Sequence, residues 1–380
     1  MAYPGEVVWQ TSCANMFLGG SIQPAGAYFL THMIRTVIFS SVMFATAYLL
    51  YVMPVFILQS LFLGTAVFST DALVPTLVAF VLLRLYLATS ITNKLVKAFV
   101  YYGMGVGFLA VMILSTFLLV KTLTGINGTT AGVAGLLILG SVTAYCVINA
   151  NSLSVRKLTV ESAKIREVTK FAFISDVHVG SNPPRHLEKI CQRLNTLEFD
   201  ALLIGGDLFD SSDFKLEDIA ALGALDTDIH FVTGNHEGYV KGFEGLLARF
   251  PELNINVLEN TAAQVRGINL IGVSDEQPVP ARAAVVEQMS REGAFNLALV
   301  HQPSIWERTQ KKIDLMLCGH THNGQIFPLN FLVRLQFRHV HGLFAEGGST
   351  LYVSSGAGCW GPRMRLGSRN EIVMIELRPV

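Results

Sequence analysis

The sequence has few charged residues for its size. Only 15% of its 380 residues are charged, whereas 51% are hydrophobic. Soluble globular proteins carry about 25% charged residues, so this composition argues against an ordinary soluble protein and in favour of membrane spans. The formal net charge is zero. Because no overall basic field would attract a polyanion, we expect no nucleic-acid partner.

Paired cysteine motifs are also missing. The chain has five cysteines, an odd number, and they are widely scattered without a CxxC pair. This pattern argues against a disulfide framework and against a zinc knuckle, and it predicts reduced, buried thiols. We also find no internal repeat and no low-complexity segment. The cysteines are Cys13, Cys146, Cys191, Cys318 and Cys359.

Long apolar runs fill the first part of the chain, between Arg35 and Asn149. A helix needs about 20 apolar residues to cross the hydrocarbon core of a bilayer. The first run contains Pro54, where we expect a kink. A buried soluble helical domain is the less favoured alternative, because the polar residues are confined to the connections. The sequence predicts spans at about 36–63, 72–91, 98–120 and 130–149.

One charged residue, Arg84, falls inside the second predicted span. A charge at this depth is costly unless the side chain extends toward the interface or pairs within the helix bundle. The alternative is that the span ends earlier than predicted.

The positive charges that flank the spans predict their orientation. Arg35 precedes the first span, Lys94 and Lys97 follow the second, and several Lys and Arg residues follow the fourth. Cytoplasmic loops carry an excess of such residues. We therefore predict a multi-pass membrane protein with its C-terminal part facing the cytoplasm, although Lys121 near a predicted outside loop does not fit this pattern.

The character of the sequence changes after Asn151. Short β-rich runs alternate there with amphipathic stretches, which is typical of an α/β domain. We predict a membrane domain with about four spans at 1–150, a linker and first strand at 151–168, and a catalytic domain at 169–380. The expected strands are 170–175, 201–205, 230–233, 269–273, 297–300, 315–318, 351–354 and 372–377. The expected helices lie around 184–197, 215–224, 241–249 and 281–291.

Histidines and carboxylates cluster where the predicted strands end. Open α/β sheets bind their ligands at such carboxyl-end loops. A pair of divalent metal ions about 3.5–4 Å apart needs a bridging carboxylate, neutral imidazoles and further oxygen donors, and this set supplies all three. A Ser-His-Asp site fits less well, because no GxSxG motif is present. Glycines at 206, 234 and 319 allow tight turns beside these donors.

Five ordered motifs in this half resemble those of the calcineurin-like metallophosphoesterase family. The resemblance covers about residues 170–377 and is strongest to the membrane-anchored branch. It implies an α/β fold, a four-layer αββα sandwich, here joined to an N-terminal multi-span helical membrane domain. The motifs are DVH at 176–178, GDLFD at 206–210, GNHE at 234–237, VHQP at 300–303 and GHTH at 319–322.

The resemblance also implies a ligand set for two divalent metal ions. One ion would be held by Asp176, His178 and His322, the other by Asn235, His301 and His320, and Asp207 would bridge them. Mixed imidazole, carboxylate and amide ligands suit Mn, Fe, Zn or Co, so the sequence does not determine the metal.

The catalytic roles follow from the same resemblance. A metal-bridging hydroxide would attack phosphorus in line. His236 would donate a proton to the leaving group or stabilise the developing charge, with Asp210 orienting it. Asn323 stands where many relatives have a second glycine after GHTH, and we expect this departure to have little effect.

Two further segments leave alternatives open. Arg363 and Arg365 follow a Gly-Pro turn, where they either receive a substrate phosphate or are simply surface residues. The stretch 326–344 mixes Phe and Leu with Arg, which suits either a membrane-surface segment or a core-packed lid.

Together these patterns predict a membrane-anchored phosphoesterase that acts on phosphoester or phosphoanhydride bonds. An amphiphilic, lipid-linked substrate is one hypothesis. A tethered phosphodiesterase or protein phosphatase that acts on soluble substrates is the alternative, and a non-catalytic scaffold or sensor is less favoured. The expected partners are a phosphoester and the lipid bilayer. The oligomeric state cannot be read from the sequence.

Overall fold

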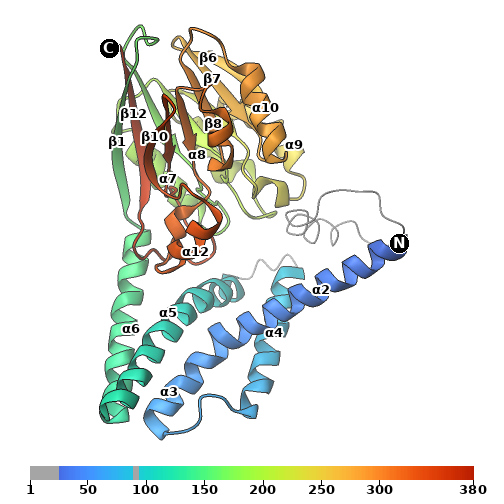
Figure 1. The fold of residues 1–380 in the computed structure, drawn as a ribbon, viewed down its shortest axis with the longest axis vertical. Coiled ribbons are helices and arrows are strands. Elements are labelled where there is room, and N and C mark those ends of the chain that lie inside the picture. The colour runs from blue at the N-terminus through green and yellow to red at the C-terminus, as the bar shows by residue number, and fades with distance from the viewer. Residues whose placement is uncertain (1–24, 89–93) are drawn as a thin grey trace. The chain divides into compact units, whose positions relative to one another are not determined.

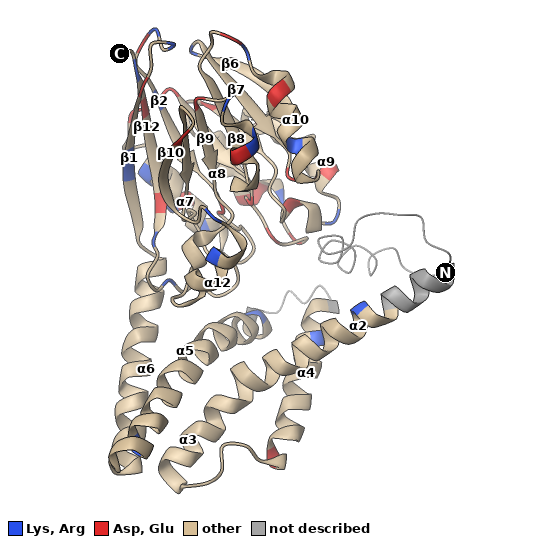
Figure 2. Cartoon of the chain, in the orientation of Figure 1, with Lys and Arg blue, Asp and Glu red and all other residues tan. Residues whose placement is uncertain are grey.

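The protein consists of two compact units, Met1–Ala144 and Tyr145–Val380. The computed structural model describes residues 25–88 and 94–380 (Figure 1). Charged residues are sparse on the helices of the first unit and frequent on the second (Figure 2). The two units therefore differ in the solvent for which their surfaces are suited.

The described part of the first unit is helical. Four helical stretches are long and apolar enough to cross a membrane, namely Met33–Leu63, Thr70–Leu87, Leu95–Thr124 and Gly128–Ala150. They overlap the four predicted spans, although the predicted end of the second, at about residue 91, lies outside the described residues. The elements are α2 (Ala25–Ala47), the π-helical turn η1 (Tyr48–Val52), α3 (Met53–Leu63), η2 (Thr70–Ala72), α4 (Leu73–Ala88), α5 (Lys94–Thr124) and α6 (Gly128–Ala150).

The first predicted span changes its helical geometry where the kink was predicted. The π-helical turn η1 directly precedes α3, whose second residue is Pro54. A proline has no N–H and its ring clashes with the carbonyl four residues earlier, here that of Leu50. A Cβ on Gly107 of α5 would overlap this same carbonyl oxygen. Gly107 thus lets α5 approach the helix at its irregular turn.

Two basic side chains of the first unit have partners within it. The guanidinium carbon of Arg84 lies 5.6 Å from the centre of the Phe39 ring, a cation–π distance. Of the three predicted possibilities for Arg84, pairing within the bundle agrees with this contact. Lys121 donates from Nζ to the carbonyl oxygen of Ser60 at 3.0 Å. A positive charge beside the end of α3 interacts favourably with the helix dipole.

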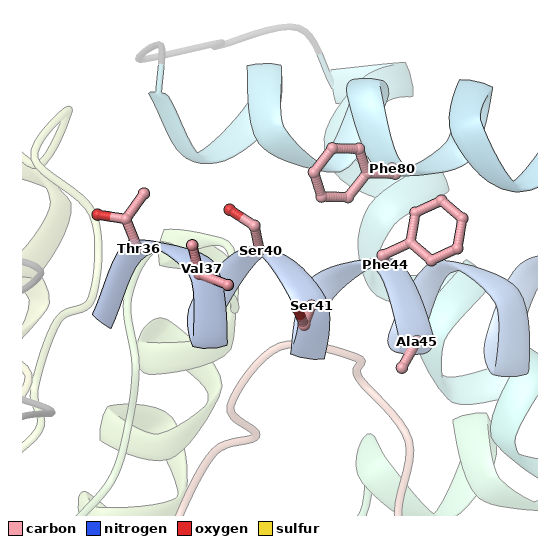
Figure 3. Close-up of a pocket in the computed structure, with 7 residues that line it drawn as sticks. All are labelled: Thr36, Val37, Ser40, Ser41, Phe44, Ala45 and Phe80. Carbon is pink, nitrogen blue, oxygen red and sulfur yellow. The ribbon is translucent and has the colours of Figure 1, made fainter. Parts of the chain in front are cut away.

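A pocket in the first unit is lined by residues of α2 and α4, among them Ser40, Phe44 and Phe80 (Figure 3). None of its lining residues is acidic, basic or a histidine. This pocket is therefore not a candidate catalytic site.

The second unit is built on two six-stranded mixed sheets. The first sheet has the order β1-β12-β2-β3-β4-β5 and the second β10-β11-β9-β8-β7-β6. The strands of the first sheet are β1 (Leu153–Glu161), β2 (Thr169–Ile174), β3 (Ala201–Gly205), β4 (Asp228–Val232), β5 (Ile255–Val257) and β12 (Asn370–Arg378). Those of the second are β6 (Thr261–Val265), β7 (Ile268–Val273), β8 (Asn296–Val300), β9 (Leu315–Cys318), β10 (Gly342–Glu346) and β11 (Ser349–Val353).

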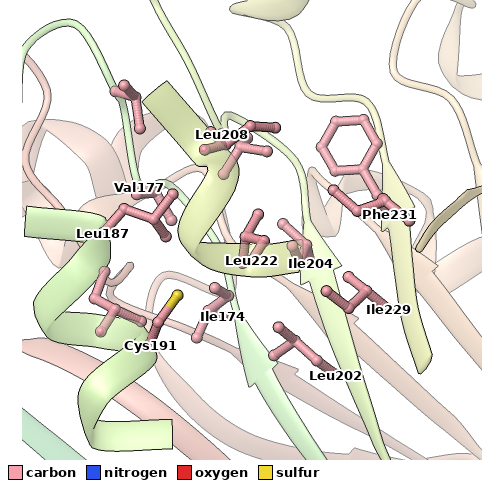
Figure 4. Close-up of a cluster of buried hydrophobic side chains, with 14 of the residues drawn as sticks. Ile174, Val177, Leu187, Cys191, Leu202, Ile204, Leu208, Leu222, Ile229 and Phe231 are labelled. Carbon is pink, nitrogen blue, oxygen red and sulfur yellow. The ribbon is translucent and has the colours of Figure 1, made fainter. Parts of the chain in front are cut away.

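Three apolar cores divide the second unit into four layers. A central core contains inward-facing residues of both sheets, such as Phe173 of β2 and Leu299 of β8. Helices α7 (Pro184–Leu194) and α8 (Ala220–Gly223) pack through Leu187 and Leu222 on the outer face of the first sheet (Figure 4). Helices α10 (Val279–Met289) and α11 (Trp306–Thr309) cover the second sheet. The predicted four-layer αββα sandwich is confirmed.

The strand sequences explain why both faces of each sheet are covered. In β2, Phe171 and Phe173 join the central core, whereas Ala172 and Ile174 join the core under α7. Side chains alternate between the faces of a strand, and a strand buried on both faces appears as an unbroken apolar run.

The stretch 326–344 forms helix α12 (Leu329–Gln336) and part of β10. No residue of α12 is buried. This excludes a core-packed helix here. The remaining short helices are η3 (Leu216–Ile219), η4 (Glu237–Tyr239), α9 (Phe243–Leu247), η5 (Phe250–Leu253), η6 (Pro303–Ile305) and η7 (His322–Gly324).

Candidate metal centre

The predicted ligands come together at one edge of the sandwich. They follow β2, β3 and β4, which are parallel neighbours in the first sheet, and β8 and β9, which are parallel neighbours in the second. Because parallel neighbours end at the same edge, each sheet brings its own polar loops side by side.

The first group of ligand atoms belongs to Asp176, His178 and His322. The Nε2 atoms of His178 and His322 lie 3.0 Å apart, and Nε2 of His322 lies 3.5 Å from Oδ1 of Asp176. Two ligand nitrogens about 2.1 Å from one cation and at a right angle to each other would be about 3 Å apart. The spacing of these atoms therefore fits a shared ion.

The second group is centred on His301. Its Nε2 lies 3.1 Å from Oδ1 of Asn235 and 3.1 Å from Nδ1 of His320. These distances are again those expected between ligands of one cation.

Asp207 lies between the two groups. Its Oδ2 is 3.1 Å from Nε2 of His301 and 3.7 Å from Nε2 of His178. The carboxylate is almost fully buried, with 2% of its surface exposed. It is the residue whose position allows contact with an ion in either group.

The backbone is strained at five of the ligands, which have positive φ angles although they are not glycines. Each such conformation costs of order 1–3 kcal/mol and persists only where the surroundings impose it. Strain of this kind gathers at functional sites. The residues are Asp176 (φ 54°), His178 (φ 49°), Asp207 (φ 53°), His320 (φ 72°) and His322 (φ 48°).

Two of the glycines beside the ligands are required by close approach. A Cβ on Gly234 would overlap the carboxylate of Asp207, and a Cβ on Gly319 would overlap that of Asp176. Asn323, where many relatives have glycine, has a φ of 51°. Asparagine tolerates this left-handed conformation better than most residues, so the departure is compatible with the turn.

The donor set fits divalent metal ions. Among the residues that the structure describes, three sets of histidine and aspartate side chains each have ligand atoms within 4.8 Å of one another, and all of these side chains are buried or half-buried. Imidazole nitrogens together with carboxylate and amide oxygens suit Mn, Fe, Zn or Co.

The pKa values of the candidate ligands shift in both directions. Burial lowers the pKa of His301, but Asp207 and the other carboxylates outweigh this and raise it well above its usual value. Two other ligands are held in the form that binds metal. Burial and the neighbouring His301 lower the pKa of His320 to about 3. Burial opposes ionisation of Asp207, but His301, His236 and His178 outweigh it and hold the pKa of Asp207 well below its usual value. His320 is thus neutral and Asp207 anionic at neutral pH, as metal ligation requires.

Sequence similarity agrees with this geometry. Residues 169–324 match the family model for calcineurin-like phosphoesterases. The chain is 33% identical to an uncharacterized metallophosphoesterase of Campylobacter jejuni over 260 residues. The alignment covers 64% of this chain and 68% of that protein. The chain belongs to the calcineurin-like phosphoesterase family.

Two other relatives align with the chain over a similar share of its length. An uncharacterized metallophosphoesterase of Helicobacter pylori is 36% identical over 228 residues, which are 57% of this chain and 61% of that protein. A transmembrane protein with a metallophosphoesterase domain from Bos taurus is 33% identical over 234 residues, which are 55% of this chain and 53% of that protein. The chain thus spans somewhat over half the length of these two relatives.

The predicted catalytic histidine lies against the first ligand group. The ring centre of His236 is 4.8 Å from that of His178, and its backbone N–H donates to Oδ1 of Asp207 at 2.9 Å. The side chain is half-buried. Burial lowers the pKa of His236, although the charge of Asp207 opposes this effect.

Asp210 has other partners than the one predicted for it. Its Oδ2 lies 3.4 Å from Nδ1 of His178, and its Oδ1 accepts a hydrogen bond from the backbone N–H of Ser181 at 2.8 Å. The carboxylate therefore lies against a metal-ligand candidate, and its role toward His236 stays a prediction. Burial lowers the pKa of His178, but Asp210 and the other nearby carboxylates outweigh this and raise it.

The two predicted substrate arginines differ in position. Arg365 is fully buried, and its Nη2 donates to the carbonyl oxygens of Ser355 and Gly358, each at 2.6 Å. The same Nη2 lies 3.3 Å from Nδ1 of His322. This location does not match the prediction that Arg365 receives a substrate. Arg363 is half-buried and donates to Oδ1 of Asn151 at 2.7 Å.

Glu237 is a buried carboxylate that sequence reasoning left without a role. It accepts backbone hydrogen bonds from Asp207 at 2.9 Å and Leu208 at 2.7 Å, and from Gly234 at 2.7 Å. Burial and the charge of Asp207 raise its pKa to about 7. The sequence feature that could have indicated a role for Glu237 is its position as the last residue of the GNHE motif. Glu237 joins the loops that follow β3 and β4.

Two aromatic rings beside the cluster had no individual role in the sequence-based prediction. The ring centre of Phe337 is 5.1 Å from that of His320, and the ring centre of Trp360 is 5.8 Å from that of His236. Both residues lie outside the five motifs, and no known sequence spacing relates them to the motif residues.

Proposed function

We propose that the protein is a membrane-anchored hydrolase of phosphoester or phosphoanhydride bonds that works with two divalent metal ions. The observation that carries this proposal is the position of Asp207, whose Oδ2 lies within 3.1 Å and 3.7 Å of ring nitrogens from the two ligand groups. Two bound cations would polarise the phosphoryl oxygens and lower the pKa of a water molecule that attacks phosphorus in line.

The side chains of the protein supply positioning and proton transfer. Asp210 keeps the ring of His178 in place through its contact with Nδ1. His236, half-buried beside the cluster, is suited to donate a proton to the leaving oxygen or to stabilise the charge that develops there. Glu237 holds the loops that carry Asp207 and Asn235 in register.

We propose that the natural substrate is amphiphilic, with its phosphate linked to a lipid. Four apolar helices support placement at a membrane. The rings of Trp360 and Phe337 beside His236 and His320 support contact with an apolar portion of the substrate. A phosphodiesterase or protein phosphatase that acts on soluble substrates is the rival function.

The same proposal places the second unit in the cytoplasm. The positive charges that flank the spans favour this orientation. Gln288 is exposed on α10. A cysteine introduced there in a chain with Cys13 replaced by serine should react with a membrane-impermeant maleimide in inverted vesicles and not in right-side-out ones. The reverse result would refute the orientation.

Metal analysis combined with an activity assay tests the hydrolase itself. The purified protein is loaded with Mn, Fe, Zn or Co, its metal content is measured, and hydrolysis of bis-p-nitrophenyl phosphate is followed for each metal. We expect close to two ions per chain and activity that requires them. Bound metal without turnover on any phosphoester would favour the scaffold or sensor function. A panel of lipid phosphates and soluble phosphodiesters then separates the two substrate classes.

A further inference from the structure

An apolar surface surrounds helix α12. We define the α12 surface as the exposed side chains of Phe327 (50% exposed), Phe331 (54%), Leu332 (61%), Leu335 (84%) and Trp360 (54%). Contiguous exposed apolar groups of this kind mark an interaction site more often than isolated ones do.

Exposed large hydrophobic side chains of the second unit are concentrated in this region. Throughout Tyr145–Val380, which the structure describes completely, only Val168 and Val380 lie elsewhere. The others belong to the α12 surface, to Leu343 on the adjoining strand β10, or to the last turn of α6. The rest of this unit has the surface of a soluble domain.

The end of α6 is joined to the α12 surface by main-chain and side-chain hydrogen bonds within the second unit. The N–H of Arg365 donates to the carbonyl of Cys146 at 3.0 Å, and Nδ2 of Asn149 donates to the carbonyl of Arg365 at 3.0 Å. The next carbonyl, that of Leu366, accepts from the N–H of Phe327 at 2.8 Å. Arg365 is thus bonded to the end of α6, and the next residue, Leu366, is bonded to Phe327 of the α12 surface. Helix α6 is apolar enough to cross a membrane, so the α12 surface lies close to the end of a candidate span.

The charges near this surface suit a lipid headgroup region. The stretch 326–344 contains Arg334 and Arg338, both exposed, and no Asp or Glu. Arg338 pairs with Glu307 at 3.2 Å. Arginine beside exposed Phe and Leu is typical of helices that lie in the interface of a bilayer, especially one with anionic lipids.

We infer that the α12 surface docks into the interface of the lipid bilayer and presents the candidate metal centre to phosphate groups of membrane lipids. The apolar rings continue from this surface to the cluster, because Trp360 lies beside His236 and Phe337, which directly follows α12, lies beside His320. The acyl chains of a lipid could then stay in the bilayer while its phosphate reaches the ligands. The choice of substrate rests on the proposed hydrolase function, whereas the docking does not.

Depth-dependent quenching tests the docking. The full chain, with Cys13 replaced by serine, is given a single exposed thiol by Leu335→Cys, because the other four cysteines are buried. It is labelled with an environment-sensitive fluorophore and reconstituted into phosphatidylcholine–phosphatidylglycerol vesicles that contain doxyl-labelled lipid. Gln288→Cys is the matched control, on α10 and away from α12 (Figure 1). We expect at least about threefold stronger quenching at position 335 than at position 288.

Other outcomes would overturn the docking. Equal quenching at the two positions would do so. A label at position 335 that is shielded from aqueous iodide but not quenched by doxyl lipid would assign the surface to a second copy or to another protein.

Substrate choice is tested with Leu332→Asp combined with Leu335→Asp. We expect hydrolysis of a lipid panel in the same vesicles, consisting of phosphatidic acid, phosphatidylglycerol and a prenyl diphosphate, to fall at least about tenfold for the lipids that are cleaved. Turnover of bis-p-nitrophenyl phosphate should stay unchanged. Cleavage of this soluble ester without cleavage of any lipid would refute the substrate class. If the wild-type chain cleaves neither kind of substrate, the hydrolase proposal fails, while the quenching result still decides the docking.

Discussion

The two ligand groups of the candidate centre differ in what holds them in place. In the first group, the carboxylate of Asp210 lies 3.4 Å from Nδ1 of His178, and the guanidinium of Arg365 donates to the main-chain oxygen of His322 at 3.2 Å. In the second group, Nδ1 of His301 lies 2.9 Å from the main-chain oxygen of Gly205, and the ring of His320 packs against Phe337.

The ligands of the first group are held by side chains, whereas His301 of the second group is held by a main-chain atom. A main-chain carbonyl is present whatever the side chain, whereas Asp210 and Arg365 can be lost by a single substitution. Partners that orient a ligating histidine typically affect metal affinity by about 10–100-fold. Metal binding by the first group should therefore be more sensitive to substitution of the residues that contact its ligands. Substitution of Asp207, which faces both groups, should affect metal binding by both groups alike.

The largest effect is expected for Asp207→Asn, which removes the carboxylate that faces both groups. We expect metal content to fall in both groups and turnover of bis-p-nitrophenyl phosphate to fall at least about 10⁴-fold, because several kcal/mol of transition-state stabilisation depend on the ions. Metal analysis and initial rates measure this. Retention of one tightly bound ion would show that the groups are more independent than the geometry indicates.

His236→Asn should separate chemistry from metal binding. His236 lies beside the ligands and is proposed to transfer a proton, so turnover should fall about 10²–10⁴-fold while metal content stays at the wild-type value. Rates with a substrate that has a good leaving group should suffer least. Unchanged turnover with every substrate would assign proton transfer to another group.

Asp210→Asn tests the comparison directly. Loss of the negative charge behind His178 should weaken binding of one ion about 10–100-fold and leave the other nearly unaffected. Titration of the metal-free protein should thus change from similar to clearly separate binding steps. Asp213→Asn is the matched control, because Asp213 is an exposed carboxylate in the same loop. Equal weakening of both steps would contradict the asymmetry.

The smallest effect is expected for Phe337→Leu, which trims the packing behind His320. Because the backbone of His320 is also fixed by hydrogen bonds from its N–H to both carboxylate oxygens of Asp176, metal affinity should change by less than about threefold. The same metal titration provides the measurement. A loss larger than that of Asp210→Asn would reverse the proposed order of the two groups.

The resemblance to the family supplied the four-layer architecture. The position of the candidate ligands followed from the sequence, since the polar motifs follow apolar strands and parallel strands end together. Short strands such as β5 (Ile255–Val257) carry too little periodic signal to be found. The contacts that the structure gives to Asp210 and Arg365 were not foreseen, for another reason. Position after a strand or a turn says that a side chain is near an edge, but its direction depends on tertiary contacts with residues far away in sequence. The assignment of ligands to ions stays a prediction.

The last turn of α6 has a practical consequence for anyone who wishes to work with a truncated, water-soluble form. Besides the bonds of Asn149, the carbonyl of Ala150 accepts from Nδ2 of Asn370 at 2.7 Å, at the start of β12, which lies between β1 and β2 in the first sheet. A chain that begins at the first residue of β1 would lack the end of α6. Arg365 would then lose its hydrogen bonds to Cys146 and Asn149, and His322, which Arg365 contacts, would be held less firmly. Shortened versions should therefore begin before Tyr145, with the exposed residues Tyr145 and Ile148 changed to polar ones.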